Sequence, residues 1–152
     1  MRIVLQRVSR GEVRVGGNTV ASVGRGLVLL VGFTNDDSQS MFPRIVDKIV
    51  DLRIFEDADG KMNLSLRDVV GGIIAVPQFT LYGNTKKGRR PSFAHAAPPQ
   101  RAEKLFDLFV SALEGTGISI GSGVFGAHME VDLVNDGPVT FVFDLAPSGE
   151  SG

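Results

Sequence analysis

The sequence predicts a single α/β domain with a mixed β-sheet and two amphipathic helices. Its 152 residues, of which 43% are hydrophobic, suit one domain with a sizeable core. Strand-like stretches are interrupted by two segments whose apolar residues recur at helical spacing. Because no internal repeat or linker-like stretch divides the chain, we expect one domain over residues 1–145 and a flexible tail over residues 146–152.

The first part of the chain is predicted to form strands. Residues alternate between apolar and polar over 2–8, 12–15 and 19–23, and the Gly-Gly-Asn at 16–18 suits the turn of a β-hairpin. The continuous apolar run at 27–33 is typical of a central strand that is covered on both faces.

The first helix is predicted from about Ser40 to about Leu52. Pro43 sets the start, because proline is tolerated only in the first turn of a helix. The apolar residues recur at helical spacing: Phe42, Ile45, Val46, Ile49 and Val50. The segment 57–60 has some likeness to the start of a calcium loop, but it lacks the later ligands, so it predicts a turn.

The second half predicts a buried strand at 73–76 that runs on into residues 78–80. Pro98 and Pro99 open the second helix, which Gly115 ends. Its predicted core face consists of Ala102, Leu105, Phe106, Phe109 and Leu113. Further strands are expected at 118–120, 129–134 and 139–143, with a break at 135–138 between the last two.

Composition excludes several classes of function. The net charge of −1 attracts no partner, and the absence of cysteine removes thiolate catalysis and disulfides. The two histidines, His95 and His128, have no ligand spacing around them, and no phosphate-binding glycine motif follows a strand, so we expect neither metal nor cofactor. No long apolar segment or signal peptide is visible, which favours a cytoplasmic protein without a membrane partner.

Two polar stretches interrupt this apolar framework. Gln78, Phe79 and Thr80 end a buried strand, and a loop with four cations and no acid follows: Lys86, Lys87, Arg89 and Arg90. This pattern suits an anionic substrate, although a polar strand end and a solvated loop would look the same. The second stretch, 135–140, suits a hairpin turn, and its Gly137-Pro138 bond can be cis or trans.

Together these stretches resemble the D-aminoacyl-tRNA deacylase family, and the resemblance runs nearly end to end. The matching motifs are Gln6-Arg7-Val8, Arg53-Ile54-Phe55, Gly60-Lys61-Met62-Asn63, Gln78-Phe79-Thr80-Leu81, Arg90-Pro91-Ser92-Phe93, Phe125-Gly126-Ala127 with Met129, and Asn135-Asp136-Gly137-Pro138-Val139-Thr140. The resemblance implies a layered β/β/α fold. It also implies an enzyme that hydrolyses the ester joining a D-amino acid, or glycine mischarged on tRNA(Ala), to the 3′ end of tRNA. The expected partner is therefore tRNA and not DNA.

The same resemblance implies roles for particular residues. Gln78, Phe79 and Thr80 would form the catalytic wall, with backbone N–H groups holding the oxyanion. Family members are homodimers in which a cis Gly-Pro unit enters the partner's pocket. Gly137 and Pro138 would fill that role and exclude L-aminoacyl esters, with Arg7, Asn135 and Thr140 beside them. Adenosine and tRNA would contact the following residues: Phe125, Gly126, Met129, Lys86, Lys87, Arg89 and Arg90.

Pro77 departs from the family pattern, which most often has Ser before the Gln. Proline has neither hydroxyl nor N–H, so no role for either passes to this position. A related deacylase that removes L-alanine from mischarged tRNA also has Pro-Gln here, although its second motif differs. That activity, and a non-catalytic module that binds tRNA 3′ ends, stay open as alternatives.

Overall fold

One long strand, β1 (Arg2–Val15), organises the sheet in this computed structural model, which describes residues 1–146. Its alternating residues bury Ile3 and Leu5 in the main core, whereas Val13 belongs to a second cluster of apolar residues. β1 pairs antiparallel with β2 (Asn18–Val23), β3 (Gly26–Gly32) and β8 (Glu130–Asp144). The two strands predicted at 2–8 and 12–15 are therefore one strand, and the predicted hairpin with 19–23 is confirmed.

β3 lies in the middle of the sheet, as its apolar sequence predicts. It pairs with β1 on one side and, in parallel, with β6 (Gly72–Pro77) on the other, and β7 (Ile120–Ser122) follows β6. The sheet is thus mixed, with the order β2-β1-β3-β6-β7 and β8 added on β1. β7 begins at the last residue of the predicted strand 118–120 and continues past it.

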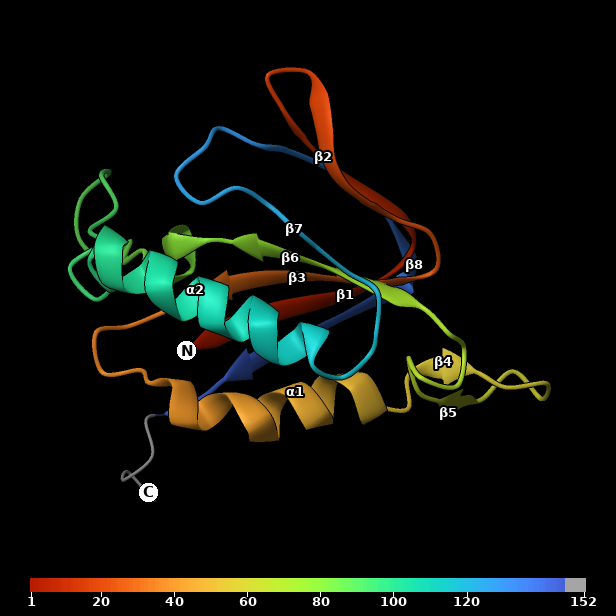
Figure 1. Cartoon of the computed structure of the whole chain (residues 1–152). Coiled ribbons are helices and arrows are strands. Elements are labelled where there is room, and N and C mark those ends of the chain that lie inside the picture. The colour runs from red at the N-terminus through yellow and green to blue at the C-terminus, as the bar shows by residue number, and fades with distance from the viewer. Residues whose placement is uncertain (147–152) are drawn as a thin grey trace.

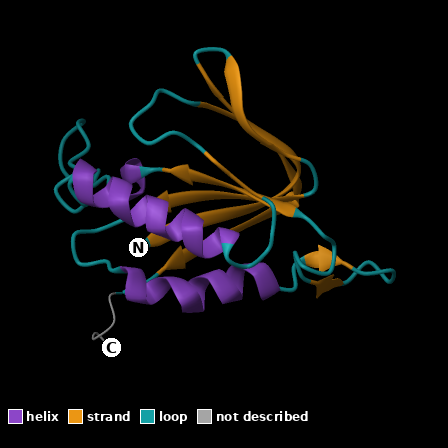
Figure 2. Ribbon diagram, viewed as in Figure 1, coloured by secondary structure: helices purple, strands orange, loops and turns teal. Residues whose placement is uncertain are grey.

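Two helices, α1 (Phe42–Asp51) and α2 (Pro99–Glu114), lie side by side over one face of the sheet (Figure 2). Both helices were predicted, and the apolar residues predicted for each helix are the ones it buries. The rings of Phe42 and Phe109 meet edge to face, 5.4 Å apart, at the contact between the helices. A second cluster of apolar residues, including Val8, Val28 and Ile74, lies away from the helices. The layered α/β arrangement is confirmed (Figure 1).

The last strand differs from its prediction, because β8 runs without a break through residues 135–138. Gln6 is paired with Thr140 and Val8 with Asn135, so residues 136–139 bulge out opposite Arg7. Sequence alone reads a Gly-Pro pair as a break because proline cannot donate to the ladder. Here the residues on both sides of the bulge pair with the same strand.

A small two-stranded sheet was missed. β4 (Phe55–Glu56) and β5 (Met62–Leu64) pair antiparallel around the predicted turn at 57–60. The Asp57 carboxylate accepts N–H groups from Asp59 and Lys61, which lowers the pKa of Asp57 and makes this segment a turn.

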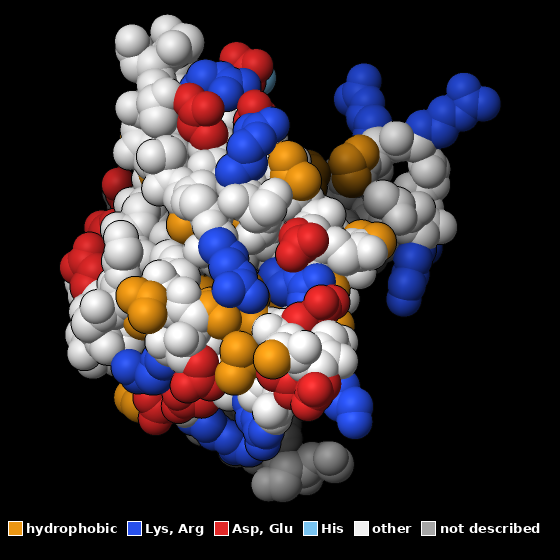
Figure 3. Space-filling view, turned by 90° about the vertical axis from the view of Figure 1, so that its right-hand side faces the viewer, with side chains coloured by type: hydrophobic (Ala, Val, Ile, Leu, Met, Phe, Trp, Pro, Cys, Tyr) orange, Lys and Arg blue, Asp and Glu red, His pale blue; other side chains and the backbone are white. Residues whose placement is uncertain are grey.

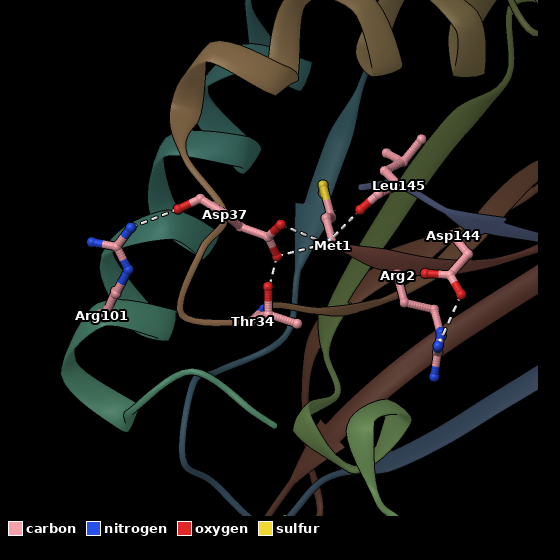
Figure 4. A network of polar contacts seen from close by, with 7 residues as sticks. All are labelled: Met1, Arg2, Thr34, Asp37, Arg101, Asp144 and Leu145. Atoms are coloured by element: carbon pink, nitrogen blue, oxygen red, sulfur yellow. Dashed lines mark hydrogen bonds and ion pairs between the residues drawn. The ribbon is translucent and has the colours of Figure 1, made fainter. Parts of the chain in front are cut away.

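The start of the chain is tied into the core (Figure 4). The Met1 ammonium donates to the Asp37 carboxylate at 2.6 Å and to the carbonyl of Leu145 at 3.1 Å. The backbone carbonyl of Asp37 accepts from Arg101 on α2. This network joins β1, the loop before α1, α2 and the end of β8. Of the tail predicted over residues 146–152, residues 147–152 lie outside the described part of the chain. Among the described helices, none is long and apolar enough to cross a membrane.

Candidate active site

A cavity of about 650 Å³ opens between the end of β6, the start of α2 and the segment before β8. Most of its wall is apolar, which suits a pocket for an organic ligand with a few polar groups to orient it. The residues that line it are Val76, Pro77, Gln78, Phe79, Phe93, Ala96, Ala97, Pro98, Pro99, Ala102, Phe125, Gly126, Ala127, His128, Met129 and Val131.

The three predicted catalytic residues lie together, although not on a strand as expected. β6 ends at Pro77, and a 3₁₀ turn, Phe79–Tyr82, follows it. The Gln78 N–H donates to the Val31 carbonyl at 2.8 Å, which fixes the start of this turn on β3. Gln78 also donates through its side-chain amide to the Thr80 hydroxyl. We call residues 78–82 the catalytic turn.

The backbone N–H groups of Phe79 and Thr80 have no acceptor within residues 1–146. They sit at the start of the 3₁₀ turn, where the geometry leaves the first donors without a partner inside the turn. Gln78 and Phe79 line the cavity, and the Thr80 side chain is exposed beside it. Two neighbouring free donors at the edge of a pocket are the arrangement that stabilises an oxyanion.

The predicted adenosine residues Phe125, Gly126 and Met129 line the same cavity as Gln78 and Phe79. Gly126 has a φ of +77°, a left-handed conformation that favours glycine. The structure therefore brings two separate sequence motifs to one pocket, although it does not assign a ligand to either.

The predicted selectivity residues form a second group around the bulge in β8. Arg7 is 4% exposed, and its guanidinium donates to the carbonyls of Asp136 and Ile54 at 3.1 and 2.7 Å. The Gly137-Pro138 peptide bond is cis, and Asn135 donates to Thr140 at 3.0 Å. None of residues 135–140 lines the cavity of their own chain. The structure therefore keeps the two groups of predicted residues apart within one chain.

The cationic loop is closed at its base by hydrogen bonds of 2.7 and 2.9 Å between Asn84 and Ser92. Its four cations are exposed, and none of them forms an ion pair with a described residue. On the body of the molecule, as far as the face in Figure 3 shows it, Lys and Arg side chains lie close to Asp and Glu side chains. Phe93 follows the loop and packs edge to face on Phe79, with ring centres 5.0 Å apart. The loop is thus joined to the catalytic turn.

Several residues of the cavity were missed by sequence reasoning. Residues 96–99 and Ala102 form the wall at the start of α2, and His128 stands beside Met129. Only the double proline at 98–99 marked this region, as a helix start and not as a pocket wall. A cavity between two elements distant in sequence has no local signal. No group of metal-binding side chains occurs among the described residues.

Comparison with known proteins shows the family to which this sequence is similar. Residues 4–144 match the family model described as D-Tyr-tRNA(Tyr) deacylase. A D-aminoacyl-tRNA deacylase of Thermoanaerobacter pseudethanolicus is 54% identical over 95% of this chain and 97% of its own. One of Geobacter sulfurreducens is 52% identical over 99% of both chains.

Two solved structures share the fold. One, titled c-Myc DNA Unwinding Element Binding Protein, is 39% identical with a TM-score of 0.88 and covers 96% of this chain and 99% of its own. The other, titled as a probable eukaryotic D-amino acid tRNA deacylase, has a TM-score of 0.82 over 95% of this chain and 98% of its own. At 22% identity, it supports the fold alone.

Proposed function

This chain belongs to the D-Tyr-tRNA(Tyr) deacylase family, and we propose that its 650 Å³ cavity holds the aminoacyl-adenosine end of tRNA. The chain is a D-aminoacyl-tRNA deacylase, a hydrolase that acts on an ester bond. The observation that carries the site assignment is the pair of N–H groups at Phe79 and Thr80 beside the cavity, which have no acceptor among residues 1–146.

The proposed chemistry needs only positioning and hydrogen bonds. A water molecule attacks the ester carbonyl, and the oxygen that becomes negative accepts the N–H groups of Phe79 and Thr80. The bond to the ribose 3′ oxygen then breaks, and the proton released by the water passes to that oxygen. The products are free tRNA and the amino acid. The neighbouring 2′-hydroxyl helps to orient the water, and Thr80 forms no covalent intermediate.

We further propose that a homodimer completes the site. Gly137 and Pro138 would enter the partner's cavity, where their carbonyls occupy the space of an L side chain. Glycine has no side chain to exclude, so its ester on tRNA(Ala) would also be cleaved. Two observations support this arrangement: Arg7 anchors the bulge through the Asp136 carbonyl, and the bulge does not line its own cavity.

The exposed apolar side chains of β8 support a dimer contact. Four large ones are exposed along the strand, Val131 at 38%, Val134 at 41%, Phe141 at 39% and Val142 at 63%, and the adjacent Phe141 and Val142 point to opposite faces of the sheet. Exposed apolar side chains that lie close together are typical of a protein–protein interface. The cationic loop, Lys86 to Arg90, is proposed to contact phosphates of the tRNA.

The test is release of amino acid from four substrates: D-Tyr-tRNA, L-Tyr-tRNA, Gly-tRNA(Ala) and mischarged L-Ala-tRNA. We expect rapid release from the first and third and little from L-Tyr-tRNA. Preferential release of L-alanine would support the alternative deacylase. Binding of all four without turnover would contradict hydrolysis and support a module that only binds the tRNA 3′ end.

A further inference from the structure

The catalytic turn is short, and few of its own hydrogen bonds hold it. Leu81 N–H donates to Gln78 O at 3.3 Å and Gly83 N–H to Thr80 O at 2.9 Å. A four-residue 3₁₀ turn has poor hydrogen-bond geometry, so it depends on its surroundings for a fixed shape. The direction in which the Phe79 and Thr80 N–H groups point therefore depends on contacts with other elements.

Arg2 supplies such a contact from the start of β1. Its guanidinium donates through Nη1 to the Leu81 carbonyl at 2.7 Å, and its central carbon lies 4.8 Å from the centre of the Tyr82 ring. The Leu81 carbonyl belongs to the end of the turn, where carbonyls lack partners within the turn. A charged donor there acts as a cap and is stronger than a neutral one.

The sheet register explains why Arg2 reaches this point. Arg2 is paired with Gly32 on β3 and with Asp144 on β8, so the three residues form a row across the sheet. A Cβ at Gly32 would stand 2.9 Å from the Gln78 carbonyl oxygen and 3.2 Å from Leu81 Cβ. The catalytic turn thus lies directly on this row, and glycine at position 32 leaves it room.

Asp144 holds the other side of the guanidinium (Figure 4). Its carboxylate accepts from Arg2 Nη2 at 2.9 Å, while Nη1 stays on the Leu81 carbonyl. Asp144 is 62% exposed, so this ion pair contributes orientation more than stability. The planar fork of arginine binds two acceptors at once in a fixed geometry, which an ammonium cannot reproduce.

We propose that Arg2 is a positioning residue for ester hydrolysis. It fixes the end of the catalytic turn so that the N–H groups of Phe79 and Thr80 stay directed at the position of the oxyanion. The inference rests on the proposed role of those two donors. Arg2 does not line the cavity in which the ester is proposed to bind, so its effect would pass through the turn. A misplacement of about 1 Å can reduce a rate by about 10²-fold, which makes such a support consequential.

The experiment compares Arg2→Met, Arg2→Lys and Asp144→Asn with Arg10→Met. Arg10 is a matched control, because it lies on the same strand, pairs with Asp132 of β8 and does not touch the turn. Single-turnover rates of D-Tyr-tRNA hydrolysis at saturating enzyme are measured together with the tRNA Kd and the Tm. Amide hydrogen exchange is measured on the free protein at Leu81 and Gly83, whose N–H groups donate hydrogen bonds within the turn.

We expect Arg2→Met to reduce the rate by about 10- to 100-fold with an unchanged Kd, and Arg2→Lys to recover part of it. Asp144→Asn should have a smaller effect, and Arg10→Met should stay within about twofold of the wild type. Amide exchange of the turn should quicken only in the Arg2 variants. Equal rates and equal exchange in Arg2→Met and Arg10→Met would overturn the proposal.

Different results would contradict the proposed hydrolysis and the positioning role of Arg2. A wild-type protein without turnover would contradict the proposed function, while the exchange data still decide whether Arg2 fixes the turn. A rate loss in Arg2→Met that follows a matching fall in Tm, without faster exchange in the turn of the folded protein, would assign Arg2 to general stability and refute a positioning role.

Discussion

At the scale of single residues, variants of Thr80 can distinguish the contribution of its hydroxyl from that of its backbone N–H. Its hydroxyl accepts from the Gln78 amide, and its backbone N–H is one of the two free donors. If the backbone does the chemistry, Thr80→Ala should keep the rate within about tenfold. Thr80→Pro removes the hydroxyl as Thr80→Ala does and also removes the backbone N–H, which donates to no residue among 1–146, so it should reduce the rate by about 10²- to 10³-fold.

Single-turnover hydrolysis of D-Tyr-tRNA measures both Thr80 variants, with circular dichroism to check that they fold. A complete loss of activity in Thr80→Ala would instead assign the reaction to the side chain.

Tyr82 is predicted to keep its proton to unusually high pH. Burial raises the pKa of Tyr82, and the Asp37 and Asp144 carboxylates raise it further, while Arg2 opposes them. In an unfolded chain a tyrosine titrates near pH 10. Because the folded state holds the proton more tightly, this contribution to stability is full below about pH 10 and declines as the pH rises further.

The chain has a single tyrosine and no tryptophan, so absorbance of the phenolate at about 295 nm reports Tyr82 alone. The folded protein should titrate at a higher pH than the protein in urea, and Tyr82→Phe should lessen the alkaline fall in Tm. Coincident titration curves for the folded and unfolded protein would refute the prediction.

At the scale of elements, the spacing of apolar residues predicted the helices, which form within one segment. It missed features that depend on the pairing of distant strands. The apolar spacing of Phe42 to Val50 predicted α1 because a helix buries one face of a single segment. The Gly137-Pro138 bulge was read as a break, because only the register against β1 shows that β8 continues past it. The 3₁₀ turn after Pro77 had no signal of its own.

The sequence likewise predicted some residues of the candidate site and missed others. Its polar residues at 78–80 were found because they interrupt an apolar strand. Arg2 and the wall at residues 96–99 were missed, because their place depends on contacts across the sheet and between elements.

The cationic loop is predicted to act as one electrostatic element. Replacing Lys86, Lys87, Arg89 and Arg90 by Gln should raise the KM for tRNA without changing the rate at saturation. The slope of log Kd against log salt should fall in size by up to about 3 to 4, since each of the four lost phosphate contacts removes about 0.7 to 0.9.

Filter binding over a range of salt concentrations gives this slope. Arg10→Gln with Arg44→Gln removes exposed cations outside the loop and serves as the control. An unchanged slope in the loop variant would contradict contact between the loop and tRNA.

At the scale of the whole molecule, one buried ion pair joins the start of the chain to both layers of the fold. The Met1 ammonium and the Asp37 carboxylate are both 0% exposed. Asp37→Asn leaves that cation without its charged partner, which should reduce the free energy of unfolding by about 3 to 5 kcal/mol. Urea unfolding measures the loss, and Asp36→Asn, an exposed neighbour, should change little. Equal stability of the two variants would contradict this role of the pair.

The proposed dimer also makes a prediction for the whole molecule. Val142→Lys places a charge at an exposed valine of β8, in the proposed dimer contact. The variant should dissociate the dimer, which sedimentation measures. If Gly137 and Pro138 act in the partner's cavity, the monomer should also lose its preference for D-Tyr-tRNA over L-Tyr-tRNA. Val70→Lys changes a valine that is 90% exposed elsewhere and should leave both properties intact. A monomeric Val142→Lys that still rejects the L ester would refute selection across subunits.

The position of Tyr82 makes the chain its own optical reporter. Because Tyr82 is the single tyrosine and the sequence has no tryptophan, ultraviolet emission comes from one ring at the end of the catalytic turn. Once the absorption of tRNA itself is corrected for, changes in the intensity or anisotropy of this emission on adding tRNA would report on the surroundings of Tyr82 at the end of the turn. Motion at the reaction site can be followed in real time without attaching a dye.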